Sequence, residues 1–189
     1  ISLQLVDATQ DNSRVANWQT KPASTNSVVP VPQWVYVNQT AILPASSARI
    51  YLYLASAGEL YLDDMMLVAG SVPESGANLL NNGNFESALS VTWSISTDFS
   101  TSVLSTSVKH SGNSSLRMLA TAAGAGNGDS IQQDFAASLP GGGTYTLSFW
   151  YLQNSNGTPF IARLNNSVVG SGIYVSLNPL TPLPSTNIV

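Results

Sequence analysis

Three carboxylates stand at positions where their chemistry matters: Asp63 and Asp64 are adjacent, and Glu86 follows a short way along the chain. Successive strand residues point to opposite faces, so the adjacent pair cannot act as a side-by-side acid and base. One of the two falls in register with Leu60 and Leu62, where a buried charge is costly unless it is paired or bound to a metal. Calcium, which takes carboxylate oxygens, is one partner, and a hydrogen-bonded carboxylate at a strand end is the alternative.

Aromatic rings are the second group, because a flat ring stacks on the C–H face of a sugar while nearby amides and carboxylates bond its hydroxyls. Trp150 points away from the apolar face of its own segment, so it is the first candidate for such a platform, and packing on the second face of a sandwich is the alternative. Further candidates are Trp34, Tyr36 and Tyr151. Trp93, by contrast, is expected in the core.

Composition excludes several classes of function. The net charge of −4 and the pI of about 4.6 give no positive field for nucleic acid. With no cysteine and one histidine, thiolate chemistry is absent and a nucleophile with its base cannot be assembled. The ten acidic residues show no opposed pair, and no apolar run is long enough to span a membrane. We therefore expect a protein that is not an enzyme, binds no nucleic acid and has no membrane span.

The elements that must position these residues are strands. Arg49, Tyr51 and Tyr53 alternate with Ile50, Leu52 and Leu54, and alternation continues through Leu60, Leu62, Asp64, Met66 and Val68. The two runs meet at Ala57-Gly58 and predict a hairpin. A second hairpin is expected at residues 140–143, pairing 144–152 with 130–135. The glycines at 124, 126 and 128 lack the context of a phosphate-binding motif and predict a loop. Charge is only 8%, and Ser, Thr and Asn abound, which favours an all-β antiparallel sandwich without long helices.

Four segments carry a resemblance to a known family: 60–70, 78–86 followed by Trp93, 108–116, and 144–151. They resemble the landmarks of jelly-roll modules similar to cellulose- and xylan-binding carbohydrate-binding modules, found in tandem in large secreted bacterial proteins that often carry a lamin-tail-like domain. The resemblance implies a jelly roll, an extracellular or cell-surface location, and polysaccharide as a partner. It also implies a structural calcium that ties the opening strand to the closing one, for which Glu86 with Asp63 or Asp64 are the candidates.

The landmarks occur in an unusual order. Residues 1–70 resemble the closing part of a module, 71–77 form a linker rich in Gly, Pro and Ser, and 78–189 resemble the opening and central part. The two parts belong either to successive modules of an array or to one permuted module. The sequence therefore predicts a non-catalytic carbohydrate-binding module. The alternative is a structural or adhesive repeat that binds neighbouring copies by strand complementation and builds a surface array or filament.

Overall fold

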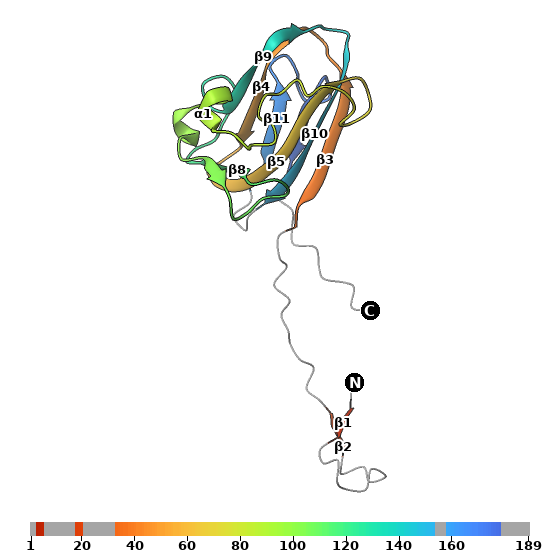
Figure 1. Ribbon diagram of the computed structural model, residues 1–189, viewed down its shortest axis with the longest axis vertical. Helices are drawn as coiled ribbons and strands as arrows, with labels where there is room; N and C mark the ends of the chain where they lie inside the picture. Colours follow the sequence, from red (N-terminus) through yellow and green to blue (C-terminus); the bar gives the residue numbers. More distant parts are fainter. Residues whose placement is uncertain (1–2, 6–17, 21–32, 154–157, 179–189) are drawn as a thin grey trace. The chain divides into compact units, whose positions relative to one another are not determined.

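The computed structural model describes residues 3–5, 18–20, 33–153 and 158–178 (Figure 1). The chain divides into two compact units, residues 1–31 with 184–189, and residues 32–183. In the first unit, strand β1 (Leu3–Leu5) pairs antiparallel with β2 (Trp18–Thr20). The second unit contains every candidate residue of the sequence analysis.

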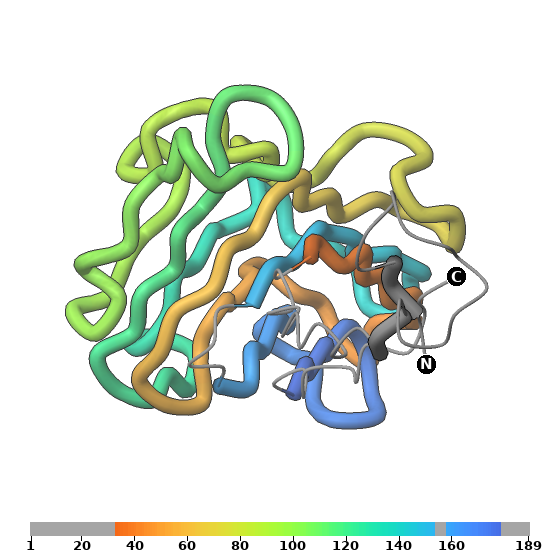
Figure 2. The backbone as a smooth tube through the Cα atoms, turned by 90° about the horizontal axis from the view of Figure 1, so that it is seen from below, coloured from red at the N-terminus to blue at the C-terminus, as the bar shows by residue number. Residues whose placement is uncertain are grey.

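Two antiparallel sheets of five strands form the second unit and lie face to face as two layers (Figure 2). We call the first sheet I; its order is β3 (Val35–Ile42), β10 (Thr144–Gln153), β5 (Gly58–Ala69), β8 (Ser115–Ala120) and β7 (Val103–Ser105). Sheet II has the order β12 (Tyr174–Leu177), β11 (Phe160–Leu164), β4 (Ser47–Leu54), β9 (Ile131–Leu139) and β6 (Ser94–Ile95). Helical structure in the described residues is confined to α1 (Leu89–Thr92) and the 3-10 turn η2 (Thr97–Phe99). The predicted all-β antiparallel sandwich is confirmed.

The core lies between the sheets and follows the predicted alternation along β4 and β10. Ile50, Leu52 and Leu54 of β4 are fully buried, as are Leu147 and Phe149 of β10. Each such side chain contributes roughly 1.5–3 kcal/mol when it leaves water. Intervening residues of the same strands form the outer faces of the sandwich.

Both predicted hairpins are wrong. β4 belongs to sheet II and β5 to sheet I, and the same holds for β9 and β10. The short connections at 55–57 and 140–143 therefore cross the sandwich from one layer to the other. The physical reason is that the apolar residues of each consecutive pair face one common core, and two strands can share a core from opposite layers as well as from one sheet.

Strands on both sides of the linker share the two sheets: β3, β4 and β5 precede it, and β6 to β12 follow it. The linker is fixed at its ends, because Gly70 N–H donates to Thr144 O and Gly70 O accepts from the Thr146 hydroxyl, each at 2.8 Å. After it, the Asn78 side chain bonds the backbone of Met65 and of Leu67. The segment 78–86, expected as an opening strand, runs beside β5 without forming a regular strand.

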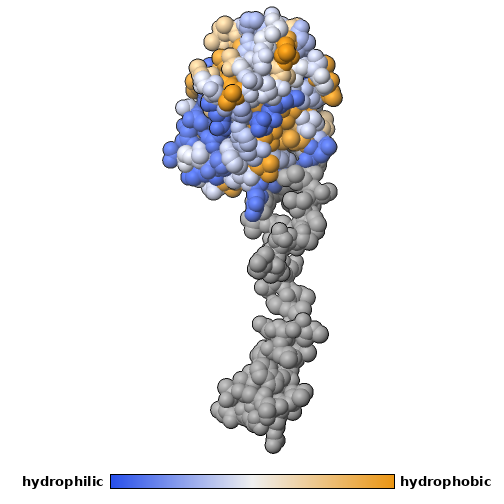
Figure 3. Space-filling model, turned by 90° about the vertical axis from the view of Figure 1, so that its right-hand side faces the viewer, coloured by the Kyte–Doolittle hydropathy of each residue, from blue (hydrophilic) through white to orange (hydrophobic). Residues whose placement is uncertain are grey.

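The outer surface shows hydrophobic residues in separate patches on the side of β3 (Figure 3). Large hydrophobic residues with high exposure in the described part of the chain lie at strand ends, in loops or in the short helix α1, namely Val35, Ile42, Val72, Val91, Val103, Val168 and Val169. No helix among the described residues has the length and apolar character needed to cross a membrane.

Candidate functional site

Asp63 and Asp64 both hold the loop that precedes β8. Asp63 is fully buried; its Oδ2 accepts the backbone N–H groups of His110 (2.9 Å) and Ser111 (3.1 Å), and its Oδ1 accepts that of Asp64. Asp64 accepts the Ser111 hydroxyl and lies 2.8 Å from His110 Nδ1. Burial raises the pKa of Asp63, against the opposing effect of these backbone donors.

The predicted face of these residues is wrong, and a β-bulge is the reason. The pairing of β5 with β10 shifts register between Ser148 and Trp150, and Asp64 adopts a left-handed φ of 50°. After the bulge, Met65 and Leu67 point into the core in place of Met66 and Val68. Asp63, rather than Asp64, is the buried charge, and it lies on the outer face of sheet I beneath the loop.

Glu86 holds the other end of the same loop. Its Oε1 accepts the backbone N–H of Asn113 (2.7 Å) and of Ser114 (3.1 Å), while its Oε2 accepts the Asn113 side-chain amide. The N–H groups of Ser114 and Asn113 lower the pKa of Glu86. We call Asp63, Asp64 and Glu86, with residues 110–114, the carboxylate clamp.

The clamp does not fit a calcium ion as it stands. The oxygen atoms that a shared ion would use accept N–H and O–H donors from the loop. Among the residues that the structure describes, no group of three acidic or histidine side chains is placed to hold one metal ion. In this geometry the three carboxylates hold the loop. Calcium binding at this place stays a prediction.

Three of the four aromatic candidates gather on the outer face of sheet I. The Trp150 ring stacks on His110 with centroids 3.9 Å apart and lies 5.3 Å from the Tyr36 ring. Trp34 meets His110 edge-on at 5.8 Å. We call Trp34, Tyr36, His110 and Trp150 the aromatic cluster. Its rings contact one another, and Trp34, Tyr36 and Trp150 are each partly exposed.

Tyr151 lies on the opposite face of the same strand. It is 1% exposed, sits in the core beside Phe160, and has a raised pKa of about 12 because of burial. A ring in this position cannot stack on a ligand at the surface. Trp93 is also buried, against Phe85, as expected.

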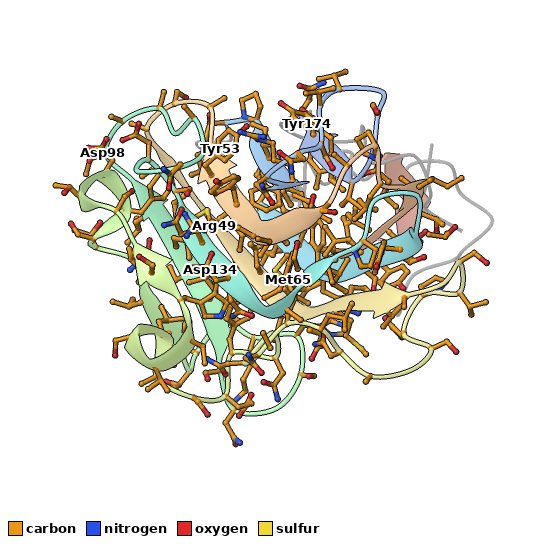
Figure 4. All side chains as sticks on the ribbon, turned by 90° about the horizontal axis from the view of Figure 1, so that it is seen from above. Arg49, Tyr53, Met65, Asp98, Asp134 and Tyr174 are labelled. Carbon is orange, nitrogen blue, oxygen red and sulfur yellow. The ribbon has the colours of Figure 1, made fainter. Side chains whose placement is uncertain are left out.

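The outer face of sheet II carries a polar aromatic row that the sequence analysis did not select. Tyr174 of β12 pairs with Arg163 of β11, Arg163 with Tyr51 of β4, and Tyr51 with Gln132 of β9. Tyr53 stands two residues from Tyr51 on the same face. We call these residues, with Arg49 and Asp134, the tyrosine face; Figure 4 labels four of its members, Arg49, Tyr53, Asp134 and Tyr174.

Hydrogen bonds connect the members of the tyrosine face. Arg163 donates from Nε to the Tyr53 hydroxyl at 3.3 Å, and its guanidinium lies over the Tyr51 ring, 5.2 Å from the centroid. Burial and a hydrogen bond with Tyr53 raise the pKa of Tyr174. Arg49 forms a two-pronged ion pair with Asp134. Tyr51 and Tyr53 are buried, each 7% exposed, whereas Tyr174, Arg163 and Gln132 are half-buried.

The alternation of Arg49, Tyr51 and Tyr53 was a usable signal for this face, because it places three polar or aromatic side chains on one side of a strand. The sequence could not show which strands lie next to β4 in the sheet. Arg163 and Tyr174 lie far along the chain, and they join the row only because β11 pairs with β4 and β12 with β11.

The fold is a sandwich of two antiparallel β-sheets. Residues 77–167, just under half of the chain, match the family described as "Carbohydrate binding domain". The match supports a carbohydrate-binding module and confirms the resemblance inferred from the sequence. No curated protein and no solved structure gives a significant match to the chain.

Proposed function

We propose that this protein is a non-catalytic carbohydrate-binding module that contacts polysaccharide through the tyrosine face. The observation that carries the proposal is the row Tyr174, Arg163, Tyr51 and Gln132, which crosses four neighbouring strands. The row offers the half-buried Tyr174 ring for sugar C–H groups, beside guanidinium and amide groups for hydroxyls. The match to a carbohydrate-binding family supports the ligand class.

The aromatic cluster is the second candidate surface for the same ligand, and it is the one that the sequence favoured. Trp34 and Tyr36 remain partly exposed, which suits contact with a sugar. His110 covers one face of the Trp150 ring at stacking distance, however, so this ring is already in use as a packing surface. We therefore rank the aromatic cluster second to the tyrosine face as a candidate binding site.

Two partly exposed tyrosines provide a matched test, since Tyr174 lies on the tyrosine face and Tyr36 in the aromatic cluster. Titration calorimetry with cello- and xylo-oligosaccharides should show that Tyr174→Ala weakens binding by about tenfold or more, while Tyr36→Ala changes it by less than about twofold. The reverse result would move the site to the aromatic cluster. Failure of the unaltered protein to bind a broad panel of polysaccharides would overturn the proposal.

We propose further that the module acts outside the cell as part of a large bacterial surface or secreted protein. The low charge and the abundance of Ser, Thr and Asn support this location. A carbohydrate-binding domain is not itself catalytic, and we expect no glycan hydrolysis by this chain. Release of reducing sugar that is lost when one carboxylate is replaced would contradict that expectation.

The alternative role as a self-assembling repeat has one observation in its favour. Residues 35–69 supply β3, β4 and β5, and β4 and β5 are inner strands without which each sheet would have open edges. A neighbouring copy can supply this segment by strand exchange, with copies of the same protein as partners. Light scattering across a range of concentrations should then reveal dimers or longer assemblies, and a monomer at every concentration would exclude this role.

A further inference from the structure

Arg163 occupies the middle of the tyrosine face and bonds only neutral groups. Nη1 donates to the backbone oxygens of Asn165 (3.5 Å) and Ser167 (3.3 Å), and Nη2 donates to that of Ala125 (3.3 Å). With the bond from Nε to Tyr53, these contacts use four of the five N–H donors of a guanidinium. All four are near the long limit for a hydrogen bond.

The other arginines in the described part of the chain differ in their partners. Arg49 binds Asp134 and Arg117 binds Glu59, each with two donors on one carboxylate. Arg163 has no carboxylate partner among the described residues. Its positive charge is therefore balanced only by carbonyl, phenol and ring dipoles.

The Nη2 edge of Arg163 lies towards solvent. The bond from Nη2 to Ala125 is exposed, whereas the bond from Nε to Tyr53 is partly buried. Gly126 makes the close approach of this loop possible, because a Cβ there would stand 2.7 Å from Nη2. The remaining donor and the weakly held Ala125 oxygen are thus at the accessible end of the guanidinium.

We propose that Arg163 makes the tyrosine face selective for a glycan that carries a carboxylate. Such a glycan is an otherwise neutral polysaccharide that contains a uronic acid unit. The proposal rests on the proposed function. A carboxylate that approaches Nη2 gains a charge-assisted hydrogen bond, which is roughly twice as strong as a bond to a neutral carbonyl. The net charge of −4 opposes a polyanion, so the ligand that fits is sparsely rather than densely charged.

The test uses one ligand in two forms: a xylo-oligosaccharide with a single glucuronic acid, and the same molecule after its carboxyl group has been reduced to an alcohol. Calorimetry on the unaltered protein should show the acidic form binding about tenfold more tightly. Added salt should narrow that difference, because a partly exposed ion pair is screened.

Arg163→Gln should bind both forms with equal affinity. The matched control is Arg117→Gln, which removes one positive charge from sheet I and should keep the preference. The comparison of the two ligands on the unaltered protein needs no variant, so a misfolded Arg163→Gln does not leave the proposal without a test.

Each outcome is decisive. Equal affinity of the unaltered protein for the two forms would overturn the selectivity and leave the proposed function standing. A preference that survives in Arg163→Gln would overturn the role of this residue. Binding of neither form, nor of any neutral glycan, would overturn the proposed function itself.

Discussion

The two outer faces of the sandwich use aromatic residues for different ends. On sheet I, Trp150 stacks on His110, and the loop that carries His110 is held by Asp63 and other carboxylates. On sheet II, tyrosines alternate across strands with Arg163 and Gln132 and leave polar groups at the surface. The difference teaches that a tryptophan that looks like a binding platform in the sequence can serve to hold a loop. The face that we propose for binding consists instead of tyrosines in register with hydrogen-bonding groups.

The largest expected effect is a loss of stability when the carboxylate clamp on sheet I is broken. Asp63→Ala removes the acceptor of three backbone N–H groups at a fully buried position, so we expect the free energy of unfolding to fall by about 3 kcal/mol or more. Urea denaturation measures the loss. Asp64→Asn is the control, because asparagine tolerates the left-handed backbone at this position and only partly exposed hydrogen bonds are lost, so it should cost about 1 kcal/mol. Equal losses in both variants would show that the buried carboxylate is not what holds the loop.

Replacement of Trp150 separates packing from binding. Trp150→Ala removes the stacking partner of His110 and should lower the free energy of unfolding by about 2 kcal/mol, with glycan affinity changed by less than about twofold. Tyr174→Ala should do the opposite, with weakened binding and a small change in stability. A loss of glycan affinity in Trp150→Ala at temperatures where it remains folded would return the site to sheet I.

Low pH should lower the free energy of unfolding by a smaller amount, and the direction of this change follows from the pKa of Glu86 in the carboxylate clamp. The pKa of Glu86 is lowered from its ordinary value of 4.5, so its contribution to stability is present above that pH and is lost as the pH falls through the folded-state pKa. Asp134, whose pKa is lowered by Arg49, acts in the same direction, and Asp63, whose pKa is raised, acts against both.

Glu86→Gln should therefore reduce, without abolishing, the loss of stability on acidification. Thermal unfolding between about pH 6 and about pH 3 measures the slope. A slope as steep in the variant as in the unaltered protein would show that Glu86 does not hold the loop in solution.

The smallest expected effect is that of calcium. Because loop donors already fill the oxygens of the clamp, we expect the melting temperature in saturating calcium to lie close to that in EDTA. A rise of several degrees with calcium, absent in Glu86→Gln, would support the structural ion that the family resemblance implies and would mean that the loop rearranges around it.

Alternation along the strands predicted the fold class and most of the core, because the period of two is a direct consequence of strand geometry. It could not predict pairing: β4 and β5 are consecutive and lie in different sheets. Nor could it predict the bulge at Asp64 and Met65, since one extra residue reverses the faces of all the strand residues that follow, while the run of residue types remains regular.

The candidate site was predicted in parts. The sequence singled out Glu86 with Asp63 and Asp64, and the structure brings all three onto one loop, although as hydrogen-bond acceptors. Of the four aromatic candidates, Trp34, Tyr36 and Trp150 gather on the outer face of sheet I, whereas Tyr151 lies in the core. The tyrosine face was missed because its members come from four strands whose adjacency is a property of the folded sheet alone.

The order of the strands affects where the boundaries of this domain should be drawn in the sequence. A boundary drawn at the matched range 77–167 would exclude β3, β4, β5 and β12, and with them Tyr51, Tyr53 and Tyr174. A recombinant fragment trimmed to that range would lack two inner strands and expose the apolar interior on both sides of each gap. Such a fragment should be insoluble for reasons unrelated to ligand binding, so searches and cloning boundaries for proteins of this order need to begin ahead of the family match rather than at it.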